Sequence, residues 1–377
     1  MSAEDLPFPL VVAEGPPLER GIAYGSTCRE RIRATIEFYR FIFQAEGRLD
    51  WDRALRAATS FAGPIHAFDP DIMEEIRGIA QGAKVSVNEI LAINVRSELL
   101  FLLKAGAASQ RPCCTALAAV PTPGCRRPML MAQNWDWYRR TMPHCVMLLI
   151  RQPPRPTIVQ LVEAGLIAKM GMNAQGIGLC TNALLTDGWR LGVPYHAILR
   201  GILNASCMAD AIGAVTQTER ASAGNYLIGH REGLAVDIEA SPGHTNILHP
   251  ANGVLTHTNH FIVSNPVDSD LMPNLWPDTI VRDRRSRKLC GDRLECIDVA
   301  DLQRILTDHF DHPSGICTHP SGRLDPDVEW QTNVSMIMDL NQRTMLVSHG
   351  PACENGYRRI DVGACFDADG MPSVSTP

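Results

Sequence analysis

The sequence predicts an α+β protein in which helices cover stacked sheets. The first ~110 residues have apolar side chains at helical spacing, whereas the chain beyond residue 111 is typical of short strands separated by turn residues. Two further helices are predicted over residues 194–215 and 299–309. Because each strand and helix must bury one apolar face, this order favours layered sheets with helices outside.

The predicted helical front contains three segments. The first spans residues 29–43, with its apolar positions at Ile32, Ile36, Phe38, Tyr39 and Ile42. Residues 71–80 form the second, and a capping-box pattern from Ser86 to Glu89 begins a third that runs to Leu103. We expect these helices to serve mainly in packing.

The strand-rich body contains isolated strands and two hairpins. The hairpins pair residues 225–229 with 234–240, and residues 334–339 with 344–349. The isolated strands are predicted over residues 128–133, 145–152, 157–163 and 176–182.

Composition excludes several classes of protein. The 377 residues carry a net charge of -6, which argues against a nucleic-acid partner. No apolar run approaches the ~18 residues of a membrane span, and the N-terminal residues lack the pattern of a signal peptide. We therefore expect a cytoplasmic protein without a membrane partner. In that compartment most of the 12 cysteines are expected to be buried thiols, and one is a candidate nucleophile.

The first candidate site is the sequence RPCCTA at residues 111–116, where the strand-rich body begins. If the chain were cut before a cysteine here, the new α-amine, with a pKa of about 7.7–8.0, would be the base for the thiol of the same residue. The alternative is that Cys113 and Cys114 are two buried structural cysteines.

The second candidate site is QNWDWY at residues 133–138, at the end of a predicted strand. A carboxylate at Asp136 can hold an ammonium group or orient the amine of a nucleophile. The rings of Trp135, Trp137 and Tyr138 are candidates for the wall of an apolar acyl pocket. The alternative is a turn aspartate beside core aromatics.

The third candidate site is THTNHF at residues 256–261. The amide of Asn259 can donate to a developing oxyanion, and His257 is a candidate for binding substrate. His257 and His260, and separately residues 308–312 with Cys317 and His319, resemble metal clusters. Neither group has a recognised zinc spacing, so we expect no metal. The glycines of residues 165–178 do not form a dinucleotide fingerprint, and no resident cofactor is expected.

Taken in order, these motifs resemble the acyl-coenzyme A:6-aminopenicillanic acid (isopenicillin N) acyltransferase family, peptidase group C45, within the N-terminal-nucleophile (Ntn) hydrolases. The resemblance covers nearly the whole chain. It rests on EIRGIAQGA at 75–83, NVRSE at 94–98, CT at 114–115, QNWDW at 133–137, EAGLIAKMGMN at 163–173, NAL at 182–184, GVP at 192–194 and HTNH at 257–260.

The resemblance implies a four-layer αββα sandwich with two stacked antiparallel sheets, made as a zymogen that cuts itself between Cys113 and Cys114. Residues 1–113 would form an α chain and residues 114–377 a catalytic β chain, associated as one globular unit. Cys114 would be the nucleophile, Asp136 the catalytic aspartate and Asn259 the oxyanion donor.

Three positions depart from the family pattern. Cys113 stands where the penicillin enzyme has glycine, which adopts strained backbone without steric cost. Tyr24 stands where histidine is common, and residues 328–331 (VEWQ) lack a Ser-Arg pair. A β-lactam nucleus is therefore not the expected substrate.

Three functions compete at this point. The first is an amidase that hydrolyses an N-acyl or aminoacyl amide through a cysteine thioester. Because the resembled family includes hydrolases of β-alanyl amines, the resemblance implies a small acylated amine as a substrate. The second is an acyltransferase that moves an acyl group from coenzyme A, as co-substrate, to an amine. The basic run from Arg282 to Lys288 would then contact pantetheine, although a solvated helix face is the expected interpretation. The third is a non-enzymatic or metal-binding protein. Association into a homo-oligomer is left open.

Overall fold

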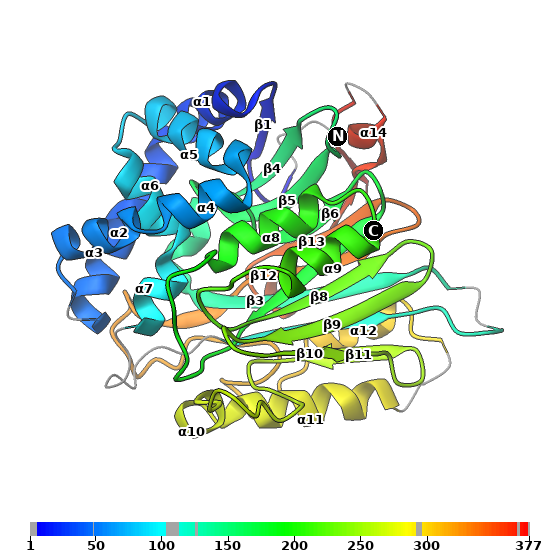
Figure 1. The fold of residues 1–377 in the computed structure, drawn as a ribbon. Coiled ribbons are helices and arrows are strands. Elements are labelled where there is room, and N and C mark those ends of the chain that lie inside the picture. Colours follow the sequence, from blue (N-terminus) through cyan, green and yellow to red (C-terminus); the bar gives the residue numbers. More distant parts are fainter. Residues whose placement is uncertain are drawn as a thin grey trace.

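A computed structural model describes residues 6–47, 49–102, 113–124, 127–291, 296–367 and 370–375. Apart from the strand β1 (Leu10–Glu14), the described N-terminal segment is helical as predicted, and its blue helices gather on one side of the molecule in Figure 1. The predicted helices 29–43 and 71–80 lie inside α2 and α5. The helices of this segment are α1 (Pro17–Thr27), α2 (Arg29–Gly47), α3 (Trp51–Thr59), α4 (Ala62–Phe68), α5 (Pro70–Ala83), α6 (Val87–Asn94) and α7 (Arg96–Leu102).

The third predicted helix is two helices. Ser86 caps α6 in the predicted capping box with Glu89, but α6 ends at Asn94. The Asn94 side chain donates to the carbonyl of Gly165 at 2.9 Å and accepts the N–H of Ile167 at 2.9 Å. This side chain therefore binds a distant loop where α6 ends, and a separate helix, α7, begins at Arg96. Leu103 lies outside the described residues.

The first sheet has eight strands in the order β1-β4-β5-β6-β7-β8-β9-β10. β1 pairs with β4 in parallel, which corrects the expectation of wholly antiparallel sheets; the other neighbours are antiparallel. The strands are β1 (Leu10–Glu14), β4 (Cys145–Arg151), β5 (Ile158–Glu163), β6 (Met170–Asn173), β7 (Ile177–Ala183), β8 (Gly224–His230), β9 (Leu234–Ala240) and β10 (Thr245–Leu248).

The second sheet has seven antiparallel strands in the order β11-β2-β3-β12-β13-β14-β15. Both predicted hairpins are confirmed, as β8–β9 in the first sheet and β12–β13 in the second. The strands are β2 (Cys113–Ala119), β3 (Leu130–Tyr138), β11 (Val254–His257), β12 (Trp330–Asp339), β13 (Thr344–His349), β14 (Arg358–Asp361) and β15 (Ser373–Ser375).

The two sheets stack, with β2 and β3 of the second against β7 of the first. α8 (Tyr195–Asn204) and α9 (Met208–Thr216), green in Figure 1, cover the first sheet, and α11 (Asp278–Gly291) and α12 (Val299–Leu306), yellow, cover the second. The predicted four-layer αββα sandwich is therefore confirmed. The predicted helix 194–215 is the pair α8 and α9. The short elements are η2 (Arg139–His144), α10 (Met272–Leu275), α13 (Ala352–Asn355) and α14 (Gly363–Phe366).

Among the described helices, none combines the length and the apolar character that crossing a bilayer requires.

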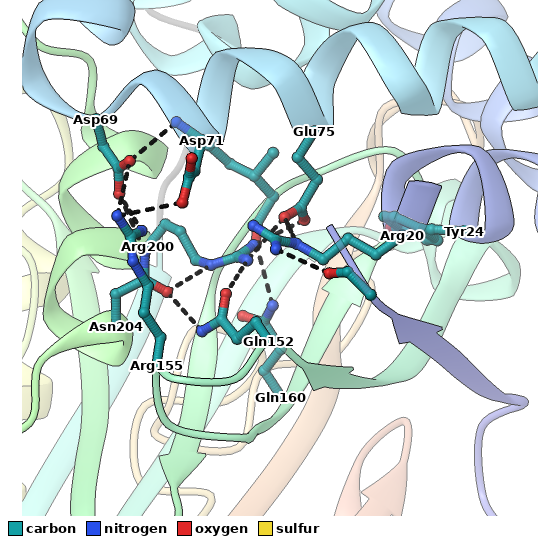
Figure 2. Close-up of polar contacts among 12 residues, drawn as sticks. Arg20, Tyr24, Asp69, Asp71, Glu75, Gln152, Arg155, Gln160, Arg200 and Asn204 are labelled. Atoms are coloured by element: carbon teal, nitrogen blue, oxygen red, sulfur yellow. Dashed lines mark hydrogen bonds and ion pairs between the residues drawn. The ribbon is translucent and has the colours of Figure 1, made fainter. Parts of the chain in front are cut away.

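A buried ionic network ties the N-terminal helices to the sandwich (Figure 2). The carboxylate of Glu75, on α5, accepts hydrogen bonds from both terminal nitrogens of Arg200 at 2.8 Å and from Nε of Arg20 at 2.5 Å. Arg200 lies on α8 and also donates to Gln152 at 3.0 Å and to Asn204 at 2.9 Å. Helices from residues 1–113 and elements from residues 114–377 therefore share one buried cluster of charges.

Two guanidinium groups keep Glu75 ionised. Burial alone would raise the pKa of this carboxyl group, but Arg200 and Arg20 outweigh it and the pKa is lowered. Removing one member of such a cluster leaves buried charge without compensation.

We expect Glu75→Gln to lower the free energy of unfolding by about 3–5 kcal/mol, because it leaves Arg20 and Arg200 buried without a counter-charge. Urea unfolding of both proteins at neutral pH measures the difference. Glu74→Gln is the matched control: its partner Arg77 is half exposed, and a loss under about 1 kcal/mol is expected. Equal unfolding midpoints for Glu75→Gln and Glu74→Gln would contradict the structural role of the cluster.

Candidate active site

Cys114 is the second residue of β2 and lies directly opposite Trp135 of β3. Directly opposed residues share a face of a sheet. Cys114, Ala116 and Trp135 belong to the core between the two sheets, whereas Leu117 packs with the apolar cluster under α11 and α12. The Cys114 thiol therefore lies on the inner face of its sheet, and Cys114 is only 5% exposed.

Two side chains, Asn259 and Arg282, hold the backbone of Cys114. Its N–H donates to Oδ1 of Asn259 at 2.7 Å. Arg282, on α11, donates from Nη1 to the carbonyl of Cys114 at 2.7 Å and from Nη2 to Oδ1 of Asn259 at 3.1 Å. The predicted nucleophile and the predicted oxyanion residue, 145 positions apart, are in direct contact.

Asn259 is fixed on every side. Its backbone N–H donates to Oγ1 of Thr279 at 2.8 Å, and its Nδ2 donates to the carbonyl of Ala183 at 3.0 Å. The neighbouring Asn182 has a buried Nδ2 with no acceptor within the described part of the chain. In the intact chain Nδ2 of Asn259 is thus bonded to Ala183, and Asn182, the residue before Ala183, has an unused donor.

Asp136 faces the other side of the sheet. It lies opposite Cys113 on one neighbouring strand and Thr332 on the other. Its carboxylate accepts from Oγ1 of Thr332 at 2.6 Å and from Oγ1 of Thr318 at 3.1 Å. Burial raises the pKa of Asp136 to about 7, against the lowering effects of both threonines and of Arg282.

Of the aromatic residues around Asp136, Trp137 and Tyr138 both pack on Trp330, whereas Trp135 lies beside Lys169. The indole of Trp135 lies under the Lys169 ammonium, with Nζ 4.2 Å from the ring centroid. Trp137 donates from Nε1 to the Tyr39 hydroxyl at 2.8 Å. Tyr138 packs on Trp330, with ring centroids 4.3 Å apart. Because strand residues alternate in direction, Trp135 and Asp136 point to opposite faces, so this indole does not enclose the carboxylate.

The electrostatic surroundings keep the thiol protonated in the intact chain. Burial, and then the Asp136 charge, raise the pKa of Cys114 to about 11, while Lys169 and Arg282 act in the opposite direction. Burial and the nearby Arg96 lower the pKa of Lys169 to about 8. Two cationic side chains therefore stand close to the thiol, ready to stabilise negative charge that develops there.

His257 lies behind Asn259 as part of the framework. It is fully buried, with Nε2 2.9 Å from Oε1 of Glu239 and Nδ1 2.8 Å from the carbonyl of Thr258. Burial acts to lower the pKa of His257, but Asp237 and Glu239 outweigh it and raise the pKa to about 9. Glu239 also accepts the N–H of Val263 at 3.1 Å. This ion pair anchors the segment that carries Asn259.

The expectation of a solvated face for the basic run on α11 is wrong for Arg282, which is 1% exposed. Arg285 pairs with Asp308, and Arg284 and Lys288 are exposed. Asp278 lies one helical turn before Arg282, and an acidic residue at that spacing indicates an ion-pair partner for Arg282. Whether this pair is buried depends on how α11 packs against β2. Sequence reasoning also missed Lys169, Thr318 and Thr332 as neighbours of the site.

Comparison with known proteins decides the family. The family model described as acyl-coenzyme A:6-aminopenicillanic acid acyl-transferase matches residues 120–324, which include Asp136 and Asn259. The 40 kDa form of acyl-coenzyme A:6-aminopenicillanic-acid-acyltransferase of Emericella nidulans is 30% identical over 284 residues, covering 74% of this chain and 76% of the relative. The chain belongs to this family. As a member of the acyl-transferase family it is an enzyme of the acyl-transferring or amide-hydrolysing kind.

Solved structures share the fold of this acyl-transferase family member. Two mutant forms of the conjugated bile acid hydrolase from Clostridium perfringens each align with a TM-score of 0.50 and 13% identity. Each alignment covers 70% of this chain and 97% of the hydrolase. At this identity the likeness concerns the Ntn-hydrolase fold alone.

The raised pKa of Asp136 predicts a pH-dependent stability. The folded chain binds this proton more tightly than the unfolded chain, so the free energy of unfolding falls as the pH rises from about 4 to about 7. In a Cys114→Ala background, we expect Asp136→Asn to remove up to about 3 kcal/mol of the fall between pH 5 and pH 8.

Urea unfolding near pH 5 and near pH 8 measures the effect, with Asp52→Asn, on the exposed surface of α3, as the control. Parallel pH profiles with and without the Asp136 carboxyl group would contradict its buried, proton-binding state.

Proposed function

We propose that the chain is the precursor of an N-terminal-cysteine amidase that cuts itself between Cys113 and Cys114 and then hydrolyses an N-acyl or aminoacyl amide. The contact between the Cys114 nitrogen and Asn259 Oδ1, 2.7 Å long, carries the proposal. It holds the atom that would become the α-amine at the point where the predicted nucleophile, oxyanion donor and Arg282 meet.

The strand register supports a role for Asp136 after the cut. Asp136 lies opposite Cys113, and Cys113 would move away when the Cys113–Cys114 peptide bond is cut. The nitrogen of Cys114 would then be a free α-amine near the Asp136 carboxylate and no longer part of a peptide bond. A cationic amine there would favour the ionised form of Asp136 and be oriented by it.

The reaction would follow from these positions. The α-amine takes the thiol proton of Cys114, and the thiolate attacks the substrate carbonyl to form a tetrahedral intermediate. Nδ2 of Asn259, once released from Ala183, would donate to the oxyanion. The unused Nδ2 of Asn182 would be a second donor, and Lys169 would add positive charge. The ammonium group protonates the leaving amine, and water hydrolyses the thioester to the acid. The proposed reaction uses no resident cofactor.

A second candidate is an acyl-coenzyme A-dependent N-acyltransferase. The Emericella nidulans relative, whose name gives acyl-coenzyme A and 6-aminopenicillanic acid, favours it. The two reactions share the Cys114 thioester and differ in whether water or an amine accepts the acyl group. The exposed Arg284 and Lys288 on α11 are available to the phosphates of a coenzyme A co-substrate.

Product analysis distinguishes these candidates. We expect the purified protein to release free acid and amine from small N-acyl amides, and Asn259→Ala to lower kcat/KM by about 10²–10³ because one oxyanion donor is lost. Asn274→Ala, exposed on α10, is the matched control and should keep the activity of the unmodified chain.

Chromatography with mass detection identifies the products, with acyl amides and acyl thioesters tested separately, each with and without an added amine. Acyl-amine product formed only from thioesters would replace the amidase with the transferase. Full turnover by Cys114→Ala would reject both.

A further inference from the structure

A cluster of histidine and cysteine side chains lies beside β12 and β13 of the second sheet, apart from the thiol of Cys114. His309, Cys317 and His319 lie in the chain between α12 and β12, and Cys353 lies on α13. One ligand atom from each side chain falls within 4.8 Å of all the others. Spacing along the chain did not predict a metal site, because the fourth member comes from 34 residues after His319.

Four of the six distances between the ligand atoms are close to those of a tetrahedral zinc site, and the two from His309 to the sulfurs lie within 4.8 Å. Zinc bonds of about 2.3 Å to sulfur and about 2.0–2.1 Å to nitrogen place two sulfurs about 3.8 Å apart, sulfur and nitrogen about 3.6 Å apart, and two nitrogens about 3.3 Å apart. The two sulfurs of Cys317 and Cys353 are 3.6 Å apart. Nε2 of His319 lies 3.5 Å from the Cys317 sulfur, 3.3 Å from the Cys353 sulfur and 3.1 Å from Nε2 of His309.

The surroundings also suit a metal. Nδ1 of His319 lies 3.2 Å from Oε1 of Glu354, so a carboxylate is placed to orient the ring that points Nε2 into the cluster. Two thiolates and two neutral imidazoles form a donor set that structural zinc sites use. We propose that His309, Cys317, His319 and Cys353 bind one zinc ion.

The chain segment that carries three of the ligands is held independently of any metal. The N–H of Cys317 donates to the carbonyl of Asp308 at 3.1 Å, and the N–H of His319 donates to that of Pro313 at 3.0 Å. Asp308 accepts two hydrogen bonds from Arg285 of α11, at 2.9 and 2.6 Å. The ligand positions are therefore largely formed by the fold, which reduces the entropy lost on binding.

The site stands directly behind Asp136. Thr318, between two of the ligands, donates to the Asp136 carboxylate at 3.1 Å. Its backbone N–H donates to Oγ1 of Thr332, the second threonine on that carboxylate. Zinc would thus fix Thr318, a positioning residue for Asp136. This consequence rests on the proposed function, whereas zinc binding itself does not.

Metal analysis tests the proposal without reference to catalysis. The Cys114→Ala chain is purified under reducing conditions, incubated with zinc chloride and desalted. Its zinc content per chain is then measured by inductively coupled plasma mass spectrometry. We expect about one zinc per chain. Cys353→Ser in the same background should lower zinc affinity at least about tenfold, since loss even of an outer partner has that effect.

Two further variants complete the design. Cys207→Ser removes an exposed free thiol elsewhere and should keep full zinc binding. His309→Ala changes an exposed ligand at the surface and should lose binding as Cys353→Ser does, with circular dichroism confirming that both remain folded. Cobalt in place of zinc should give a thiolate charge-transfer band that both variants weaken.

Absence of zinc binding by the reduced chain at micromolar zinc would overturn the proposal. So would equal zinc content in Cys353→Ser and Cys207→Ser. A disulfide between Cys317 and Cys353 that persists under reducing conditions would identify the cluster as a covalent crosslink instead. If zinc binds but its removal leaves turnover and self-cleavage unchanged, the proposed zinc site is supported and the proposed effect of zinc on Asp136 is rejected.

Discussion

The pairing of β2 with β3 is the constraint on which the site depends. In this register Cys114 lies opposite Trp135 and Cys113 opposite Asp136. A shift by one residue would move every side chain of β2 to the other face of the sheet. The thiol would then leave the core between the sheets, and the peptide before it would no longer lie beside the Asp136 carboxylate.

The rest of the fold keeps this register in place from both faces. On one face α11 brings Arg282 to the carbonyl of Cys114, and on the other Lys169 lies over Trp135. The ionic network around Glu75 joins the N-terminal helices to α8 (Figure 2). A second buried ion pair, Arg96 with Glu163 at 2.5 Å, joins α7 to β5. Contacts of this kind would hold the two proposed chains together after cleavage without a covalent link.

Local signals in the sequence predicted much of the fold. The capping box at Ser86 and the hairpins β8–β9 and β12–β13 were predictable because each depends on neighbouring residues alone. The order of the motifs placed Cys114, Asp136 and Asn259 together, and the structure brings Cys114 and Asn259 into contact. The division at residue 113 stays a prediction.

Other parts depend on contacts between distant segments and could not be predicted in this way. The burial of Arg282 follows from how α11 packs on the second sheet, and the parallel pairing of β1 joins segments more than 130 residues apart. The cluster with Cys353 is likewise assembled by the path of the chain. Nothing in the spacing of a single motif carries that information.

Intact mass measurement under denaturing, reducing conditions tests the central claim most directly. The account predicts that the unmodified protein separates into two chains, residues 1–113 and 114–377, with Cys114 at the new N-terminus. It predicts a single full-length chain for Cys114→Ala. A single full-length chain in both proteins, or a cut at another bond, would contradict it.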